Sequence, residues 1–287
     1  MARHSQAVGR YVTIDVDGIE YEVFYLRSGS GQPLVCQHAA GCHNHQWRDM
    51  LEDEDITRHY DVIAYDLPWH GKSDPPVNQE WWKQEYRLTA DHFMKFVLRL
   101  CAALNLERPV FMGASFGGNL ALQLARYHSE RFRAVVPIGA LDYSPGFFQD
   151  IWRNPRANPA HAIPNLLWDS MAPQSPERDR RLALHHASQG AEAFHGDLYF
   201  YSVDHDLRGE LEKIDARACP VVLMSGTYDY IAPPTAVEAV ARKIPGGVFV
   251  EMDELGHLPM VENYPKFRRY LLEALKVVER KSRVGAG

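Results

Sequence analysis

The stretch MGASFGGNLALQLA, residues 112–125, carries the most specific pattern in the chain. It places Gly-x-Ser-x-Gly between an apolar run and an amphipathic run, which is the context of a tight strand-to-helix turn. A serine on such a turn has a strained backbone, and Gly113 and Gly117 leave room for neighbouring chain to approach. We therefore predict that the Ser115 hydroxyl projects from the end of a strand as a candidate nucleophile. A phosphate-binding glycine turn is the competing interpretation, but the third glycine or GK[ST] ending of such turns is missing.

Apolar runs with strand character alternate with helical runs on both sides of this turn. Asp17-Gly18 separates the first two strands and predicts a hairpin. The predicted strands are 11–16, 20–26, 33–37, 61–66, 109–113, 134–140, 220–226 and 248–252, and the predicted helices are 88–104, 118–128 and 261–277. Continuous apolar strands alternating with helices predict an α/β fold, with a mostly parallel eight-stranded sheet covered by helices on both faces.

The alternation stops between Asp142 and about Ile214, in a segment rich in Pro, His, Trp and Tyr. A structureless segment of about 70 residues is implausible inside a compact domain. We therefore predict a small helical cap over residues 144–213, inserted after the sixth strand. Residues 1–143 and 214–287 would then form the core domain.

A serine hydroxyl becomes an effective nucleophile when a histidine removes its proton and an acid orients that histidine. Asp229 follows the seventh predicted strand and His257 follows the eighth. The chain order Ser115, Asp229, His257 matches the order expected for this type of serine turn. Asp142, at the end of the sixth strand, remains a rival acid, because a loop after that strand can also reach the histidine.

Several further motifs accompany this pattern. QHAAG follows the third predicted strand, DLPWHGKSDPP follows the fourth, GASFGG lies at the turn, and GTYDYIAPP and GHLPMVENYP follow the last two. Together they resemble the motifs of the α/β-hydrolase fold family over nearly the whole chain. The resemblance implies the α/β-hydrolase fold, a cap after the sixth strand and nucleophilic catalysis. These motifs do not specify a substrate.

Two backbone N–H groups are expected to stabilise the anion that forms when the serine attacks a carbonyl. One is Phe116, the residue after the nucleophile. In similar hydrolases the loop after the third strand begins His-Gly and the next residue donates, which implies Ala40 here. Alanine replaces the usual glycine, so Ala39 remains an alternative donor and a candidate substrate contact. His38 is expected to brace the loop.

CQHAAGCHNHQW, residues 36–47, contains two cysteines and three histidines, a composition typical of metal sites. The pattern His43-x-His45 nevertheless lacks the aspartate of the H-x-H-x-D-H motif, because Trp47 occupies that position. Cys36 and Cys42 are also too widely spaced for the close pair of a structural zinc site. We expect no metal and no cofactor, and we place His43 at the mouth of the active site as a substrate contact.

The composition, with 46% hydrophobic and 24% charged residues, predicts a globular protein. Thirty-one basic and 37 acidic residues give a net charge of −6 without a run of lysine and arginine, so no nucleic-acid or membrane partner is expected. The N-terminal residues lack the apolar stretch of a signal peptide, which favours a cytoplasmic protein with reduced thiols. The oligomeric state stays open, a homodimer included.

Aromatic residues of the predicted cap favour an apolar cavity, with Trp152 as a substrate contact. They are Phe147, Phe148, Trp152, Trp168, Phe194, Tyr199, Phe200 and Tyr201. The resulting hypothesis is hydrolysis of a small, largely apolar ester or lactone through an acyl-enzyme on Ser115. One alternative is a hydrolase of carbon–carbon bonds in ring-fission diketones, although the H-G-G-G-P-G loop common in those enzymes is missing. Another is a receptor-like protein that binds a small ligand with little turnover.

Overall fold

The computed structural model describes residues 5–154, 156, 159–187 and 191–284. Eight strands form one sheet in the order β1-β2-β4-β3-β5-β6-β7-β8. The strands are β1 (Val8–Val16), β2 (Ile19–Gly29), β3 (Gln32–Gln37), β4 (Tyr60–Tyr65), β5 (Val110–Ala114), β6 (Ala134–Ile138), β7 (Val222–Gly226) and β8 (Val248–Met252). Each predicted strand is therefore present, and β1 and β2 are longer than predicted because their hairpin ladder runs out to the pair Val8 and Arg27.

The sheet is antiparallel only at its first edge. Strand β2 runs antiparallel to both β1 and β4, whereas the pairs from β4 to β8 are all parallel. Every residue of β4, β5, β6 and β7 is buried. Strands that are buried on both sides require helices on both faces of the sheet. This explains why the sequences of these strands are continuous apolar runs.

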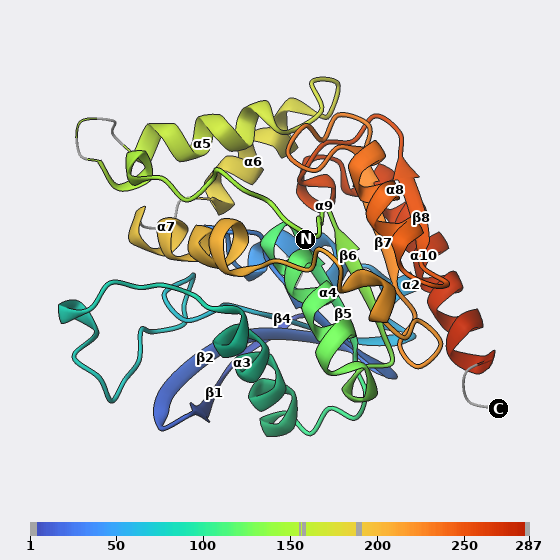
Figure 1. Cartoon of the computed structure of the whole chain (residues 1–287), viewed down its shortest axis with the longest axis horizontal. Helices are drawn as coiled ribbons and strands as arrows, with labels where there is room; N and C mark the ends of the chain where they lie inside the picture. Colours follow the sequence, from blue (N-terminus) through green and yellow to red (C-terminus); the bar gives the residue numbers. More distant parts are fainter. Residues whose placement is uncertain (1–4, 155, 157–158, 188–190, 285–287) are drawn as a thin grey trace.

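Helices flank the sheet and connect its strands (Figure 1). In the described residues there are ten α-helices and several short 3₁₀ segments. The helices are α1 (Arg48–Leu51), α2 (Glu54–Thr57), α3 (Ala90–Ala103), α4 (Phe116–Tyr127), α5 (Pro159–Asp169), α6 (Glu177–His186), α7 (Ala191–Tyr199), α8 (Pro234–Lys243), α9 (Pro259–Glu262) and α10 (Tyr264–Val284). The 3₁₀ segments are η1 (Asn44–Trp47), η2 (Trp81–Lys83), η3 (Ser129–Arg131), η4 (Asp150–Arg153) and η6 (Leu211–Lys213), and η5 (Phe200–Asp204) is a π-helix.

The C-terminal region differs from the single helix predicted for 261–277. It contains two helices, α9 and α10, separated at Asn263, whose backbone (φ −161°, ψ 74°) is not helical. Pro265 stands in the first turn of α10, where proline is tolerated because the N–H it lacks would have no partner in that turn. The chain therefore starts a new helix instead of continuing the old one.

The segment between β6 and β7, in which the sequence shows no alternation of strands and helices, is helical. Helices α5, α6 and α7 form a layer along the top and left of the sheet in Figure 1. Leu166 and Leu167 of α5 and Leu198 of α7 line the same cavity as Ser115, at the end of β5. This segment therefore covers the carboxyl ends of the central strands.

Two general features of the described chain complete the fold. All four cysteine thiols are buried and free. Within the ranges given above, no helix combines the length and apolar character that a bilayer crossing requires.

Candidate active site

Ser115 occupies the sharp turn between β5 and α4. Its backbone is left-handed, with φ 56° and ψ −118°, a conformation that is costly for a residue with a side chain. The surrounding structure holds this geometry, because Ser115 N–H donates to Ile138 O at 2.8 Å and Ser115 O accepts from Gly118 N–H at 2.7 Å. The predicted strain at the serine is thus present.

The glycines around the serine are required by close contact. A Cβ atom added at Gly113 would lie 2.0 Å from the backbone oxygen of Gly117. One added at Gly117 would lie 2.6 Å from Gln37 Cγ, on the neighbouring strand β3. Larger residues would therefore push α4 away from the strands and move the serine.

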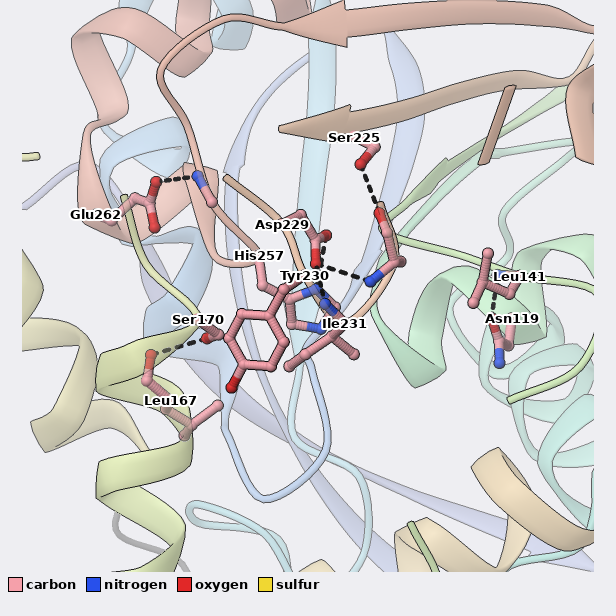
Figure 2. Close-up of polar contacts among 12 residues, drawn as sticks. Asn119, Leu141, Leu167, Ser170, Ser225, Asp229, Tyr230, Ile231, His257 and Glu262 are labelled. Atoms are coloured by element: carbon pink, nitrogen blue, oxygen red, sulfur yellow. Dashed lines mark hydrogen bonds and ion pairs between the residues drawn. The ribbon is translucent and has the colours of Figure 1, made fainter. Parts of the chain in front are cut away.

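His257 and Asp229 meet beside this turn, although they come from loops after different strands (Figure 2). His257 Nδ1 lies 2.8 Å from Asp229 Oδ2, and the other carboxylate oxygen accepts the N–H groups of Ile231 and Ala232 at 3.0 and 2.8 Å. Both side chains are buried, with 3% of each residue exposed. A carboxylate only accepts hydrogen bonds, so Nδ1 carries a proton, and in the neutral ring Nε2 keeps its lone pair.

Asp142, the rival acid, faces another partner. Its Oδ2 lies 2.8 Å from Lys243 Nζ at the end of α8. The carboxylate in contact with His257 is that of Asp229.

The loop that carries His257 is tied to the segment after α5. His257 N–H donates to Ser170 O at 2.8 Å. Gly256 N–H donates to Glu262, whose buried carboxyl has a pKa raised to about 7 by the loss of solvent (Figure 2). The position of the imidazole therefore depends on this helical segment as well as on the sheet.

Ser115 and His257 line one small cavity with a volume of about 30 Å³. The remaining wall comes from the loop after β3 and from α5, α7 and their connections: Ala39, Ala40, Phe147, Leu166, Leu167, Phe194, Leu198, Tyr201 and Ile231. A cavity of this size holds about one or two water molecules. The site is therefore small and mostly apolar.

In the loop after β3, the Ala40 N–H is available for an anion, whereas the N–H groups on either side of it are occupied. Ala39 N–H donates to Gln46 Oε1 at 2.7 Å, Gly41 N–H to Asp197 Oδ2 at 2.9 Å, and Cys42 N–H to Ala39 O at 3.0 Å. Ala40 N–H has no acceptor among the residues that the structure describes. Phe116 N–H is the first of α4, where no earlier turn supplies an acceptor.

These features can be compared with known proteins. A family model described as alpha/beta hydrolase fold matches residues 32–264. The chain belongs to the α/β-hydrolase fold family. Strands β3 to β8, the strained serine turn and the helical insertion between β6 and β7 all lie in the matched region.

Known proteins are similar to this α/β hydrolase over all or part of their length. The pimeloyl-[acyl-carrier protein] methyl ester esterase of Chromobacterium violaceum is 27% identical over 267 residues, covering 88% of this chain and 98% of that protein. The solved structure of the enol-lactonase from Burkholderia xenovorans LB400 has a TM-score of 0.79 and 22% identity, covering 93% of this chain and 100% of that one. A third relative, the 2-hydroxy-6-oxo-6-(2'-aminophenyl)hexa-2,4-dienoic acid hydrolase of Metapseudomonas resinovorans, is 30% identical over 134 residues, covering 45% of this chain and 43% of that protein.

Two side chains predicted to contact the substrate lie outside the cavity wall of this α/β hydrolase. Trp152 packs edge-on against Phe194 at 5.4 Å, and its indole N–H donates to Phe147 O at 2.7 Å, so it stands behind the wall. His43 faces the rings of His45 and His186 at 5.3 and 5.4 Å. Contacts with neighbouring side chains thus draw both residues away from the cavity, which sequence spacing could not reveal.

The rings of His43, His45 and His186 pack against one another. Burial lowers the pKa of His43 to about 4 and that of His186 to about 3, so both rings are neutral at pH 7. Across the described parts of the chain, no three His, Cys, Asp or Glu side chains converge to bind a metal ion.

Asp197 on α7 connects the helical segment to the loop that carries Ala40, and sequence analysis missed it. Its Oδ2 accepts from Gly41 N–H and lies 2.9 Å from His70 Nε2, and its Oδ1 accepts from the Tyr86 hydroxyl at 3.0 Å. His38 supports the same loop, because its Nε2 accepts from Leu67 N–H at 3.1 Å. The only sequence signal for Asp197 is a lone carboxylate inside the aromatic run FHGDLYF, residues 194–200.

The buried His70–Asp197 pair should make folding stability depend on pH. Both ring nitrogens of His70 face acceptors, Asp197 Oδ2 and Pro68 O, which favours the imidazolium. Burial lowers the pKa of His70, but the Asp197 carboxylate more than compensates, so its pKa lies above 6.5. A raised folded-state pKa contributes stability that is complete below the unfolded value of about 6.5 and is lost as pH rises through the folded value.

We expect His70→Ala to cost about 3–5 kcal/mol of unfolding free energy at pH 6, because it leaves a buried carboxylate without its cation. The difference from wild type should shrink as the pH rises towards 9. Urea unfolding at a series of pH values measures it, with the exposed His59→Ala as control. A difference that is constant across this pH range would contradict the charged pair.

Proposed function

We propose that this α/β hydrolase is a serine hydrolase that cleaves a small, largely apolar carboxylic ester or lactone through an acyl-enzyme on Ser115. The observation that carries the proposal is the shared cavity. A strained serine and a histidine whose Nδ1 is held by a buried carboxylate both line it, and the rest of its wall is mostly apolar. Residues 144–213 act as its cap.

The mechanism follows from the orientation of the imidazole. His257 Nε2 takes the proton of the Ser115 hydroxyl as its oxygen attacks the substrate carbonyl, and Asp229 stabilises the resulting imidazolium. The N–H groups of Phe116 and Ala40 donate to the carbonyl oxygen as it becomes an anion. His257 then gives the proton to the leaving alcohol. In the second half-reaction it activates a water molecule that releases the acid from Ser115.

Substrate entry requires movement of the cap. The cavity of about 30 Å³ is too small for an ester, and its wall includes side chains from α5 and α7. The Ser170 contact to His257 and the Asp197 contact to Gly41 link the same segment to the catalytic loops. Closure of the cap over the bound substrate would therefore exclude water and align these loops together.

Carbon–carbon bond hydrolysis is the second candidate function. The observation in its favour is the 30% identity with the relative from Metapseudomonas resinovorans, which spans only 45% of this chain. The loop QHAAG, in which alanines stand at positions 39 and 40, favours the ester reaction.

A panel of activity-based measurements tests the proposal. A fluorophosphonate probe should label the folded protein on the peptide that contains Ser115, and heat-denatured protein should remain unlabelled. Short-chain p-nitrophenyl esters and aliphatic lactones should be turned over faster than a ring-fission diketone. Faster cleavage of the diketone would support the carbon–carbon hydrolase instead. Labelling without turnover of any of these compounds would point to a receptor-like protein.

A further inference from the structure

The cavity contains one polar side chain that the proposed mechanism does not use. Tyr201 lines the wall from η5, the π-helix that follows α7, and only 2% of the residue is exposed. Its hydroxyl is buried and has no hydrogen-bond partner among the residues that the structure describes. π-Helical turns of this kind occur frequently at functional sites.

A second unpaired hydroxyl lies beside it. Ser144, in the connection after β6, is also 2% exposed, and its buried oxygen likewise has no partner in the described chain. The side chains of Ser144 and Ser115 act on the pKa of the Tyr201 hydroxyl as hydrogen-bonding neighbours, although neither contact has the full geometry of a hydrogen bond. Buried polar groups in proteins are almost always hydrogen-bonded, so two adjacent exceptions next to a nucleophile call for a ligand.

The sheet topology separates this hydroxyl pair from the oxyanion donors. Strand β5, which ends at Ser115, lies between β3 and β6. Ala40 follows β3, whereas Ser144 follows β6. Tyr201 packs edge-on, at 5.4 Å, against the ring of Phe147, which lies in the same connection after β6 as Ser144. The Tyr201 hydroxyl therefore meets a different part of the substrate from the scissile carbonyl oxygen.

We propose that Tyr201 and Ser144 form a polar subsite that binds a second oxygen of the substrate, close to the scissile carbonyl. This inference rests on the proposed ester or lactone hydrolysis and narrows its substrate class. The preferred substrates carry an ether, hydroxyl or keto oxygen next to the reacting carbonyl, and Tyr201 donates a hydrogen bond to that oxygen. The rest of the substrate remains apolar, as the other side chains of the wall require.

Two phenyl esters of matched shape test the subsite. Phenyl methoxyacetate and phenyl butanoate differ by an oxygen in place of a methylene group, two bonds from the carbonyl carbon. The ratio of their kcat/KM values in each protein cancels changes that affect both esters equally. We expect Tyr201→Phe to lower the methoxyacetate-to-butanoate ratio about tenfold, the effect of one lost hydrogen bond. Ser144→Ala should lower it less, because Tyr201 is the donor.

Tyr199→Phe is the matched control. It removes a tyrosine hydroxyl two residues away, and the ring packs against Phe148 and Arg87 outside the cavity wall. This variant should keep the wild-type ratio. Tyr201→Phe should also unfold at the same temperature as wild type or higher, because it removes an unpaired buried hydroxyl. If the Tyr201 hydroxyl had only a structural role, Tyr201→Phe would instead leave the methoxyacetate-to-butanoate ratio unchanged and would lower the unfolding temperature.

Each outcome bears on one of the two proposals. An unchanged ratio in both Tyr201→Phe and Ser144→Ala overturns the subsite. An equal loss of kcat/KM for both esters also overturns it, because Tyr201 would then act on a group that the two share. Failure of the wild-type protein to hydrolyse either ester, despite labelling by a fluorophosphonate, would count against the proposed function itself.

Discussion

Ser115→Ala should lower kcat for an activated phenyl ester by about 10⁴- to 10⁶-fold while leaving the fold intact. In the proposed mechanism the acyl-enzyme forms on this oxygen, and no neighbouring side chain on the turn can replace it. KM should change little, because the cavity wall and the two proposed N–H donors remain. Initial rates at saturating substrate, with circular dichroism of the variant, measure both parts of the expectation.

The matched control is Ser129→Ala, in the 3₁₀ segment η3 beyond the far end of α4. It should keep wild-type rates and wild-type labelling by a fluorophosphonate. Ser115→Ala should lose the label completely. If Ser115→Ala kept more than about one hundredth of the wild-type kcat, an acyl-enzyme on this serine would be ruled out as the main route.

Asp229→Asn should lower kcat by about 10³- to 10⁴-fold. An asparagine of the same shape still accepts the N–H groups of Ile231 and Ala232 at its oxygen, but its NH₂ group then faces His257 Nδ1. The imidazole would respond by carrying its proton on Nε2, which is the wrong tautomer for a base towards Ser115. The loss should appear in kcat across pH 6–9 and should be partly relieved at high pH.

Asp142→Asn provides the control, because Asp142 is the other acid that the sequence allows. Its carboxylate pairs with Lys243 on the surface, and 48% of that lysine side chain is exposed. An exposed pair of this kind contributes little to stability, so the variant should fold and keep kcat within about twofold of wild type. If Asp142→Asn had the larger effect on kcat, the acid would be Asp142 and the observed Asp229 contact would be structural.

The order of elements could be predicted because it depends on local patterns. The eight strands are short apolar runs, and helices such as α3 and α4 show apolar residues at helical spacing. The serine turn could be recognised for a similar reason, since Gly-x-Ser-x-Gly is a local pattern and Gly113 is required by a close backbone contact with Gly117 in the same turn. The break of the C-terminal helix at Asn263 was missed, although Pro265 was its local signal.

The side chains that line the cavity were predicted with less success than the order of the elements. Trp152 and His43 were chosen for their residue type and their place near the site, yet each turns towards other side chains. Tyr201 was expected only as one aromatic residue among eight in the cap, and Asp197 was not considered. The preference for Ala40 over Ala39 as the second backbone donor also depends on the tertiary structure, because Gln46 Oε1 already accepts the Ala39 N–H.

By itself, the sequence determined the α/β architecture, the strained serine turn, and the loops that carry the candidate histidine and acid, since periodicity and turn chemistry act over a few residues. The tertiary structure alone decided that Asp229 rather than Asp142 meets His257. It also decided that, within the described part of the chain, the Ala40 N–H and the Tyr201 hydroxyl in the cavity have no hydrogen-bond partner. These contacts join residues far apart in the chain, and their geometry depends on how whole elements pack together.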